Sequence, residues 1–456
     1  MRGSISSTSL CRIAAFVCIA AVVRADRQDS VALLRKEIAA RPDDAALRVQ
    51  LVELLLDSEH FNEAATEIQA GLLLNSQAAA LHRVYGDLLF RQGRVGEAEA
   101  EYNAAIDSDH NNALAIYGSA RVLRATGYRA RAAGLVRAAH ALAPDNEEIG
   151  RAFAAIEERH ESELASPYQH YELPYRLLPE GRGSFGVGLP ISVNGAKAEL
   201  RLDTGAGGVT VSARFAAKAG IHSIGRATSW GIGSDSGVDT WLGYAEELRI
   251  GGLAFKNVIV SVAVHGSIDK SGGLIGAGLF KRFLLKIDFE NRRVDLNPLF
   301  GPPWDGYAAV DRYEGPEMKP FAAMVQVRHY LLLPTAVSER ERSDTTHALF
   351  LIDTGAGFNS ISTDLARRVT TVRKNHHMSV KGVSGTVKML YEADRILLRF
   401  AGSACPVPRL AAFDLSDISR SAGMEVGGIL GMPALGAFRS ITIDYRDEAI
   451  LFEGPK

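Results

Sequence analysis

The chain has 456 residues, of which 47% are hydrophobic and 23% are charged, the balance of a folded globular protein. Its formal net charge of −2 at pH 7 excludes a broad electrostatic attraction to nucleic acid or to anionic lipid. A chain of this length is too long for one ordinary hydrophobic core, so we expect two or three domains.

The N-terminal segment 1–25 has the pattern of a secretory signal peptide. Basic residues precede the apolar run 13–23, and positions 23–25 offer aliphatic and small side chains at the cleavage site. We expect cleavage after Ala25 and export to the periplasm or the cell exterior; an uncleaved anchor is the alternative. Beyond this segment the chain has no apolar run long enough to span a bilayer, so we expect no membrane association after cleavage.

Residues 26–164 are expected to form a helical repeat. Three blocks of equal length, 43–76, 77–110 and 111–144, carry small and large apolar residues in register. The small residues recur at Ala64, Ala98 and Ala132, and again at Gly71, Ala105 and Ala139. Pairs of short helices that pack at small residues cannot bury their own faces, so several pairs must stack.

This register resembles the tetratricopeptide repeat (TPR). The resemblance implies that a protein or peptide partner binds on the concave face of the stacked helices. A stacking spacer that binds no ligand is the alternative. A linker is expected at residues 165–182, because Pro167, Pro174 and Pro179 disfavour a continuous helix.

From residue 183 onward the pattern is that of β-strands, and it occurs twice. Strands joined by the turn dipeptide Asn194-Gly195 lead into the first copy of a short acidic motif. We therefore expect one lobe at 183–300, a bridge at 301–316 and a second lobe at 317–456.

The acidic motif is Asp-Thr-Gly-Ala, which follows a strand at 203–206 and again at 353–356. Downstream of each motif, at a similar separation, two apolar residues precede a glycine, Gly276 in one copy and Gly431 in the other. This arrangement resembles the aspartic peptidases. Each lobe is similar in size to a retropepsin-like subunit, whereas one chain carries both lobes, as in pepsins. Together, the two resemblances predict an all-α helical solenoid of TPR type followed by an all-β bilobal protease of two pseudo-symmetric barrels.

The chemistry expected of the motif depends on Asp203 and Asp353. Two carboxylates held face to face cannot both ionise easily, so the pair shares a proton. The ionised acid would act as general base on a water, and the protonated acid would donate to the scissile carbonyl oxygen. Which of the two carries the proton stays open.

The neighbouring residues have expected supporting roles. Gly205 and Gly355 allow backbone N–H groups to approach the carboxylates. By the family's pattern, Thr204 and Thr354 form hydrogen bonds between the lobes. The structural glycines, Gly276 and Gly431, let a strand pass close beneath the active-site loop.

Gly-rich segments between each acid and its downstream glycine are candidates for flaps that bind an extended substrate. The candidate flap-tip residues are Trp230, Ile232 and Gly233 in the first lobe and Val383 and Ser384 in the second.

No metal or cofactor is expected. The chain has no His-Glu-x-x-His motif, and the neighbouring His376 and His377 would point to opposite faces of a strand. Pepsin-like lobes carry Ser or Thr where this chain has Ala206 and Ala356. A hydroxyl at that position favours the ionised carboxylate, so its absence predicts a less acidic working range.

The sequence therefore predicts an exported aspartic endopeptidase with a TPR module for docking. The alternative is a non-catalytic scaffold, in which a pseudo-protease grips a peptide without cutting it. Pairing of lobes between two chains is a third arrangement. The short bridge disfavours it, so we expect a monomer with an intramolecular pair of acids.

Overall fold

The structure is a computed structural model that describes residues 29–157, 163–179, 185–229, 232, 238–264, 272–340, 344–375, 380–382, 385–387 and 389–455. The expected signal peptide lies outside these residues. The chain divides into two compact units, residues 1–122 with 134–153 and residues 123–133 with 154–456. No helix in the described ranges combines the length and apolar character that crossing a membrane requires.

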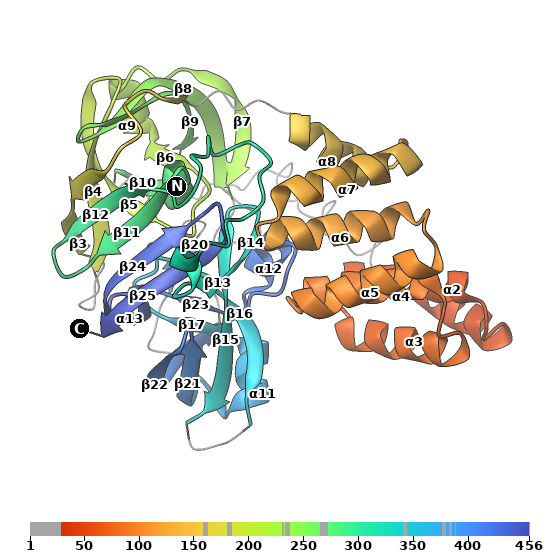
Figure 1. The fold of residues 1–456 in the computed structure, drawn as a ribbon. Coiled ribbons are helices and arrows are strands. Elements are labelled where there is room, and N and C mark those ends of the chain that lie inside the picture. The colour runs from red at the N-terminus through yellow and green to blue at the C-terminus, as the bar shows by residue number, and fades with distance from the viewer. Residues whose placement is uncertain are drawn as a thin grey trace, which may run out of the picture. The chain divides into compact units, whose positions relative to one another are not determined.

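After a first helix over residues 29–40, the N-terminal region is built from helical hairpins (Figure 1). The helices are α2 (Ala45–Asp57), α3 (Phe61–Leu74), α4 (Ala79–Arg91), α5 (Val95–Ser108), α6 (Ala113–Ala125), α7 (Arg129–Leu142) and α8 (Glu147–Glu157). The first helices of successive hairpins begin at Ala45, Ala79 and Ala113. This constant spacing equals that of the sequence blocks and confirms the expected repeat.

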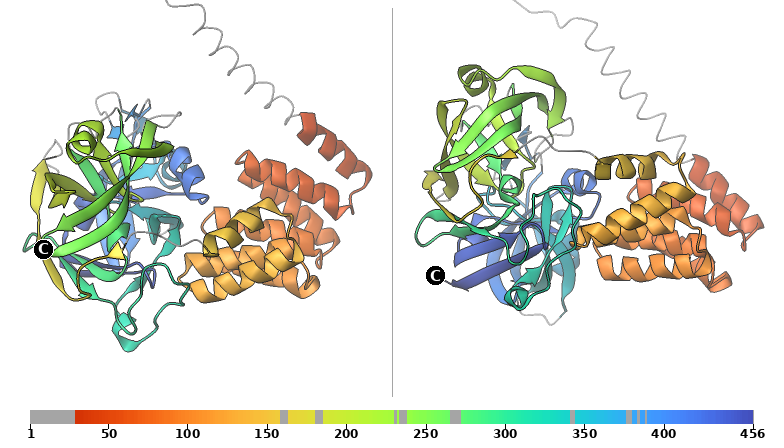
Figure 2. Two further views of the ribbon diagram at one scale, coloured as in Figure 1. Left: turned by 90° about the horizontal axis from the view of Figure 1, so that it is seen from above. Right: turned by 45° about the horizontal axis from the view of Figure 1, so that its top comes forward.

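Small residues let neighbouring helices approach closely, as the sequence predicted. Tyr102 on α5 is fully buried, and its ring occupies the space where side chains at Gly86 and Gly118 would lie. The turn inside each hairpin has a residue with positive φ, at Glu59, Gly93 and Gly127. In Figure 2 these helices, coloured red to orange, stack pair upon pair.

The first lobe is a curled sheet with the strand order β1-β9-β6-β10-β5-β4-β8-β7. Pairing between β8 and β9 closes the sheet, and β3 pairs with β4 outside this order. Asn194 and Gly195 both have positive φ, so the β4–β5 hairpin has the expected tight turn. The elements of the first lobe are β1 (Glu163–Leu164), β3 (Arg176–Pro179), β4 (Phe185–Val193), β5 (Ala196–Asp203), β6 (Val209–Ser212), α9 (Ala213–Lys218), β7 (Ser223–Ser229), β8 (Val238–Ile250), β9 (Leu253–Ala263), β10 (Gly273–Gly276) and η1 (Ala277–Phe280).

The second lobe repeats this topology, in the order β14-β15-β16-β23-β17-β22-β21-β18 and closed by β15–β21 pairing. Its elements are β14 (Val325–Val327), β15 (Tyr330–Glu339), β16 (Thr346–Ile352), β17 (Ser360–Ser362), α11 (Thr363–Val369), β18 (Val372–Lys374), β19 (Lys381–Gly382), β20 (Gly385–Thr386), β21 (Tyr391–Phe400), β22 (Ser403–Phe413), α12 (Ser416–Ala422), β23 (Gly428–Leu430) and α13 (Met432–Leu435).

A six-stranded antiparallel sheet, in the order β13-β25-β24-β11-β12-β2, joins the two lobes. At its centre Lys286 pairs with Thr442, the residue at the equivalent place in the second copy. The lobes are thus related by a pseudo-two-fold axis, and the blue β24 lies beside the green β11 in Figure 1. The strands of this sheet are β2 (Tyr171–Pro174), β11 (Phe283–Asp288), β12 (Arg293–Pro298), β13 (Ala322–Ala323), β24 (Phe438–Asp444) and β25 (Ala449–Pro455). The short helix η2 (Pro316–Met318) precedes β13.

These observations confirm the fold class, an all-α helical repeat followed by an all-β region of two lobes. The boundary between them differs from the expected one. The strands β2 and β3 lie within 165–182, where a linker was expected, and β1 pairs with β9. Proline lacks the N–H that a central strand needs, but it is compatible with a strand at the edge of a sheet, and β2 is an edge strand.

Candidate active site

The two Asp-Thr-Gly-Ala motifs occupy equivalent places in the two lobes. Asp203 is the last residue of β5, and Asp353 directly follows β16. In each lobe a strand from the downstream glycine motif runs parallel to the acid-bearing strand, β10 beside β5 and β23 beside β16. The pseudo-two-fold axis brings the two acids together.

The carboxyl groups of Asp203 and Asp353 are in contact and share a hydrogen bond. A Cβ atom added to Gly205 would lie 3.0 Å from Cγ of Asp353, and one added to Gly355 would lie 2.6 Å from Cγ of Asp203. Each glycine N–H donates to Oδ1 of the acid in its own motif, at 2.8 Å. A side chain at Gly355 would overlap Asp203, and one at Gly205 would press against Asp353, so both glycines let the backbone approach the acids, as the sequence predicted.

Thr204 and Thr354 form the expected hydrogen bonds between the lobes. The N–H of each threonine donates to the hydroxyl of the other, at 3.1 and 3.0 Å. Each hydroxyl in turn donates to a carbonyl of the opposite lobe, that of Ile352 at 2.7 Å and that of Leu202 at 2.9 Å. Both threonines are fully buried, so this symmetric set fixes the backbone beneath the acids.

The electrostatics of the pair favour a proton held between the carboxylates. Burial raises the pKa of Asp203, because desolvation penalises the charged form. The hydrogen bond from Gly205, the charge of Arg201 and the hydrogen bond with Asp353 act in the opposite direction. Burial is the largest effect, so Asp203 retains a proton to higher pH than an exposed aspartate does.

Gly276 and Gly431 pass close beneath the active-site loops, as expected. A Cβ at Gly276 would lie 2.5 Å from the carbonyl oxygen of Ala206, and one at Gly431 would overlap the carbonyl oxygen of Phe358. The N–H of Gly431 donates to Oδ1 of Asn359 at 2.9 Å, a contact that sequence reasoning missed.

The structure describes one of the five candidate flap residues. Ile232 lies against Gly382 on β19, so a segment of the first lobe contacts a hairpin of the second. Trp230, Gly233, Val383 and Ser384 lie outside the described residues, and their role remains a prediction.

Three further residues near the pair were not singled out from the sequence. Arg201 lies two positions before Asp203 on β5, and strand alternation could have identified it. His329 in the β14–β15 turn lies against Gly207 of the opposite lobe, and burial lowers its pKa. Tyr445 is buried, and burial and the charge of Asp203 raise its pKa. The last two come from distant parts of the chain and have no local sequence signal.

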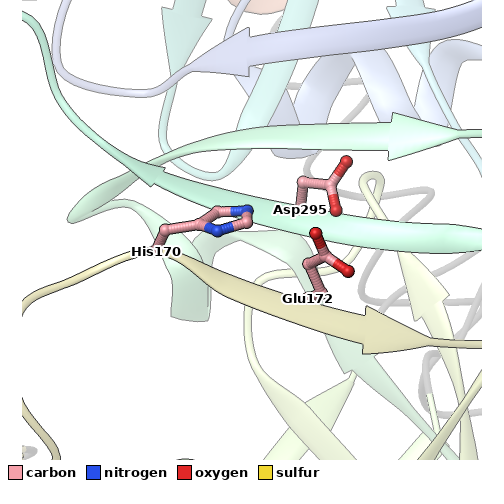
Figure 3. Close-up of side chains that lie close together, drawn as sticks. All are labelled: His170, Glu172 and Asp295. Atoms are coloured by element: carbon pink, nitrogen blue, oxygen red, sulfur yellow. The ribbon is translucent and has the colours of Figure 1, made fainter.

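A group of side chains elsewhere has donor atoms of the kind that bind metals. His170 lies just before β2, Glu172 lies on β2 and Asp295 lies on the neighbouring β12 (Figure 3). One donor atom of each side chain lies within 4.8 Å of the others. The guanidinium of Arg293 lies 3.3 Å from Glu172 and 3.1 Å from Asp295. Arginine therefore already supplies positive charge to both carboxylates, and a cation would have to compete with it.

Comparison with known proteins gives a match to one lobe. The family model for aspartyl proteases matches residues 189–279, which run from β4 to η1. No curated protein matches the chain. The match to a crystal structure of MamA covers 29% of this chain and 77% of the MamA chain, with 17% sequence identity and a TM-score of 0.25. The match to the crystal structure of the aspartic proteinase from Irpex lacteus covers 63% of this chain and 98% of the proteinase chain, with 10% sequence identity and a TM-score of 0.39.

Proposed function

We propose that the C-terminal region is an aspartic endopeptidase that hydrolyses peptide bonds with a water activated between Asp203 and Asp353. The observation that carries this proposal is the contact between the two carboxyl groups, each held by the N–H of its own glycine. The family model that matches the first lobe supports it.

The reaction uses the pair as one acid and one base. The ionised carboxylate removes a proton from the water, whose oxygen attacks the scissile carbonyl carbon. The protonated carboxyl donates its proton to the carbonyl oxygen, which gives a neutral gem-diol. When the diol collapses, one of its hydroxyl protons returns to a carboxylate, the amide nitrogen receives the other acid's proton, and the C–N bond breaks. The pair ends with one proton, as it began.

The direct test is cleavage of a mixed peptide library, followed by mass spectrometry. Hydrolysis by the wild-type chain should be lost in Asp203→Asn and equally in Asp353→Asn, because either change removes half of the acid–base pair. Asp364→Asn, which alters an exposed acid on α11, is the matched control and should retain activity. Binding of peptides without any cleavage by the wild type would instead favour the non-catalytic scaffold.

The helical region is proposed to dock a protein or peptide on its concave face. If so, a protein substrate should be cleaved with a higher kcat/KM than a short peptide that contains the same site. Equal values for the two substrates would favour a stacking spacer.

Export and the monomeric state are also proposals. Export predicts that the mature N-terminus begins at Asp26, which N-terminal sequencing of protein expressed with its leader would show. An intramolecular pair of acids predicts that the active species sediments as a monomer. Activity confined to a dimer would contradict that arrangement.

A further inference from the structure

The floor of the active site differs between the two lobes at one position. On β5 the residues Leu200 and Leu202 are fully buried, whereas Glu199, Arg201 and Asp203 are partly exposed. Because successive side chains of a strand point to opposite faces, Arg201 lies on the same face as Asp203. Two residues along a strand are about 7 Å apart, which an arginine side chain can span.

The register partners of Arg201 differ from those of the equivalent residue in the second lobe. They are Gly188 on β4 and Leu274 on β10, and the space beside Gly188 is filled by Leu178 and by the carboxylate of Glu199. In the second lobe the equivalent position is Leu351, whose register partners are Leu332 and Ile429. These three residues are at most 3% exposed. The first lobe therefore has a partly exposed cation beside the acids where the second has a buried apolar row.

Given the proposed endopeptidase function, we propose that Arg201 selects substrates with a carboxylate side chain adjacent to the scissile bond, on the side that lies over the first lobe. A peptide extended across the two acids places the side chains next to the scissile bond over the ends of β5 and β16. Guanidinium groups stay charged at all working pH values and bind carboxylates through two parallel hydrogen bonds. The second lobe carries no charge at this position, so the preference applies to one side of the bond.

Arg201 also acts on Asp203, since its charge lowers the pKa of that carboxyl. A role confined to Asp203 would affect all substrates alike. Such a common effect cancels when the cleavage rate of a peptide with Glu is divided by that of the same peptide with Gln. The carboxylate of Glu199 lies on the same face of β5, 4.0 Å from Arg176. A substrate carboxylate would have to compete with this acid for Arg201.

The experiment uses octapeptide libraries with Glu or Gln fixed at one of the two central positions and random residues elsewhere. One set has an ordinary central amide and measures cleavage. The other has a fluorescent label and a reduced central amide, which cannot be hydrolysed, and measures binding. The wild type is compared with Arg201→Leu, which reproduces the second lobe, with Arg201→Lys, and with Lys197→Leu. The last removes an exposed charge from the same strand and is the matched control.

We expect the wild type to prefer Glu over Gln by about 5- to 10-fold at one central position, in cleavage and in binding, since the site is partly solvated. Arg201→Leu should reduce this ratio to about one, Arg201→Lys should retain part of it, and Lys197→Leu should leave it unchanged. Added salt should lower the ratio in the wild type, which tests the proposal without any variant.

The two proposals fail in different ways. Selective binding without cleavage would overturn the proposed protease activity and leave the role of Arg201 standing. Cleavage with no preference for Glu, or with a preference that Arg201→Leu retains, would overturn the role of Arg201 alone. The absence of both cleavage and selective binding would overturn both.

Discussion

Thr204 and Thr354 each donate an N–H to the other's hydroxyl, across the pseudo-two-fold axis and directly beneath the two acids. Both hydroxyl groups also donate to carbonyls of the opposite lobe. Four hydrogen bonds in a fully buried place thus join the two lobes where the carboxyl groups meet. The position of each acid relative to the other depends on this set.

Thr354→Val should therefore impair activity and stability together. Valine has nearly the same shape as threonine but leaves the N–H of Thr204 and the carbonyl of Leu202 buried without partners. Each unsatisfied group costs about 1–3 kcal/mol, so the free energy of unfolding should fall by about 2–5 kcal/mol. Chemical denaturation measures this change, and peptide cleavage should fall at least 10-fold.

The matched control is Thr354→Ser, which retains the hydroxyl and loses only a methyl group. It should recover most of the activity. A serine variant as inactive as the valine variant would show that hydrogen bonding is not what holds the acids.

Ala206→Ser should move the acid limb of the pH–rate profile to lower pH. Burial raises the pKa of Asp203, and a hydroxyl that donates to the carboxylate would stabilise its ionised form. The ionised acid would then persist to lower pH and keep the base available there. The wild type should be most active in a less acidic range than a digestive pepsin. Peak activity of the wild type at strongly acid pH would contradict this expectation.

Asp444→Asn should reduce the dependence of stability on pH. Asp444 is fully buried at the end of β24, and its Oδ1 accepts N–H groups from Arg446 and Asp447 at 3.0 and 3.1 Å. Burial and the negative charge of Asp447 raise its pKa to about 7. A carboxyl whose folded-state pKa is raised stabilises the fold at low pH, and this contribution is lost as the pH rises through the folded-state value.

Between pH 5 and pH 8 the free energy of unfolding of the wild type should accordingly fall by about 1–3 kcal/mol more than that of Asp444→Asn. Asparagine keeps an oxygen to accept the two N–H groups but cannot ionise. Parallel measurements on Asp203→Asn separate the contribution of Asp203, whose pKa is also raised and contributes with the same sign. Equal pH slopes in Asp444→Asn and the wild type would show that Asp444 does not titrate in this range.

Gly118→Ala and Gly134→Ala should have opposite effects on the helical repeat. Both glycines lie within helices, α6 and α7. A Cβ at Gly118 would overlap the buried ring of Tyr102, whereas one at Gly134 would meet no atom within 4 Å. We expect Gly118→Ala to destabilise by about 1–3 kcal/mol and Gly134→Ala to stabilise by up to about 1 kcal/mol. Thermal unfolding followed by circular dichroism measures both, and destabilisation by both would contradict the packing described.

The duplicated motif made much of this arrangement predictable. The five residues that begin at Asp203 and at Asp353 are identical in the two lobes, and each set follows an apolar strand, so a single local pattern indicates both strands and both supporting glycines. The register of the N-terminal blocks likewise predicted the helical hairpins, because small residues mark each contact between helices.

Features that depend on distant parts of the chain were harder to predict. The prolines of 165–182 were compatible with either a linker or edge strands, and only the partner strands β12 and β4 decide between them. The contact of His329 with Gly207 joins the two lobes and has no signal near either residue. Arg201 differs from these, because its place shortly before Asp203 on the same strand was readable from strand alternation.

The most direct test of the central claim is a crystal structure of the protein with a peptide isostere whose scissile amide is replaced by a hydroxyl-bearing carbon. A single active site made by both acids predicts that the isostere hydroxyl lies within hydrogen-bond distance of Asp203 and of Asp353 at once. A hydroxyl bound by only one of the two carboxylates, or an isostere bound elsewhere, would contradict the account.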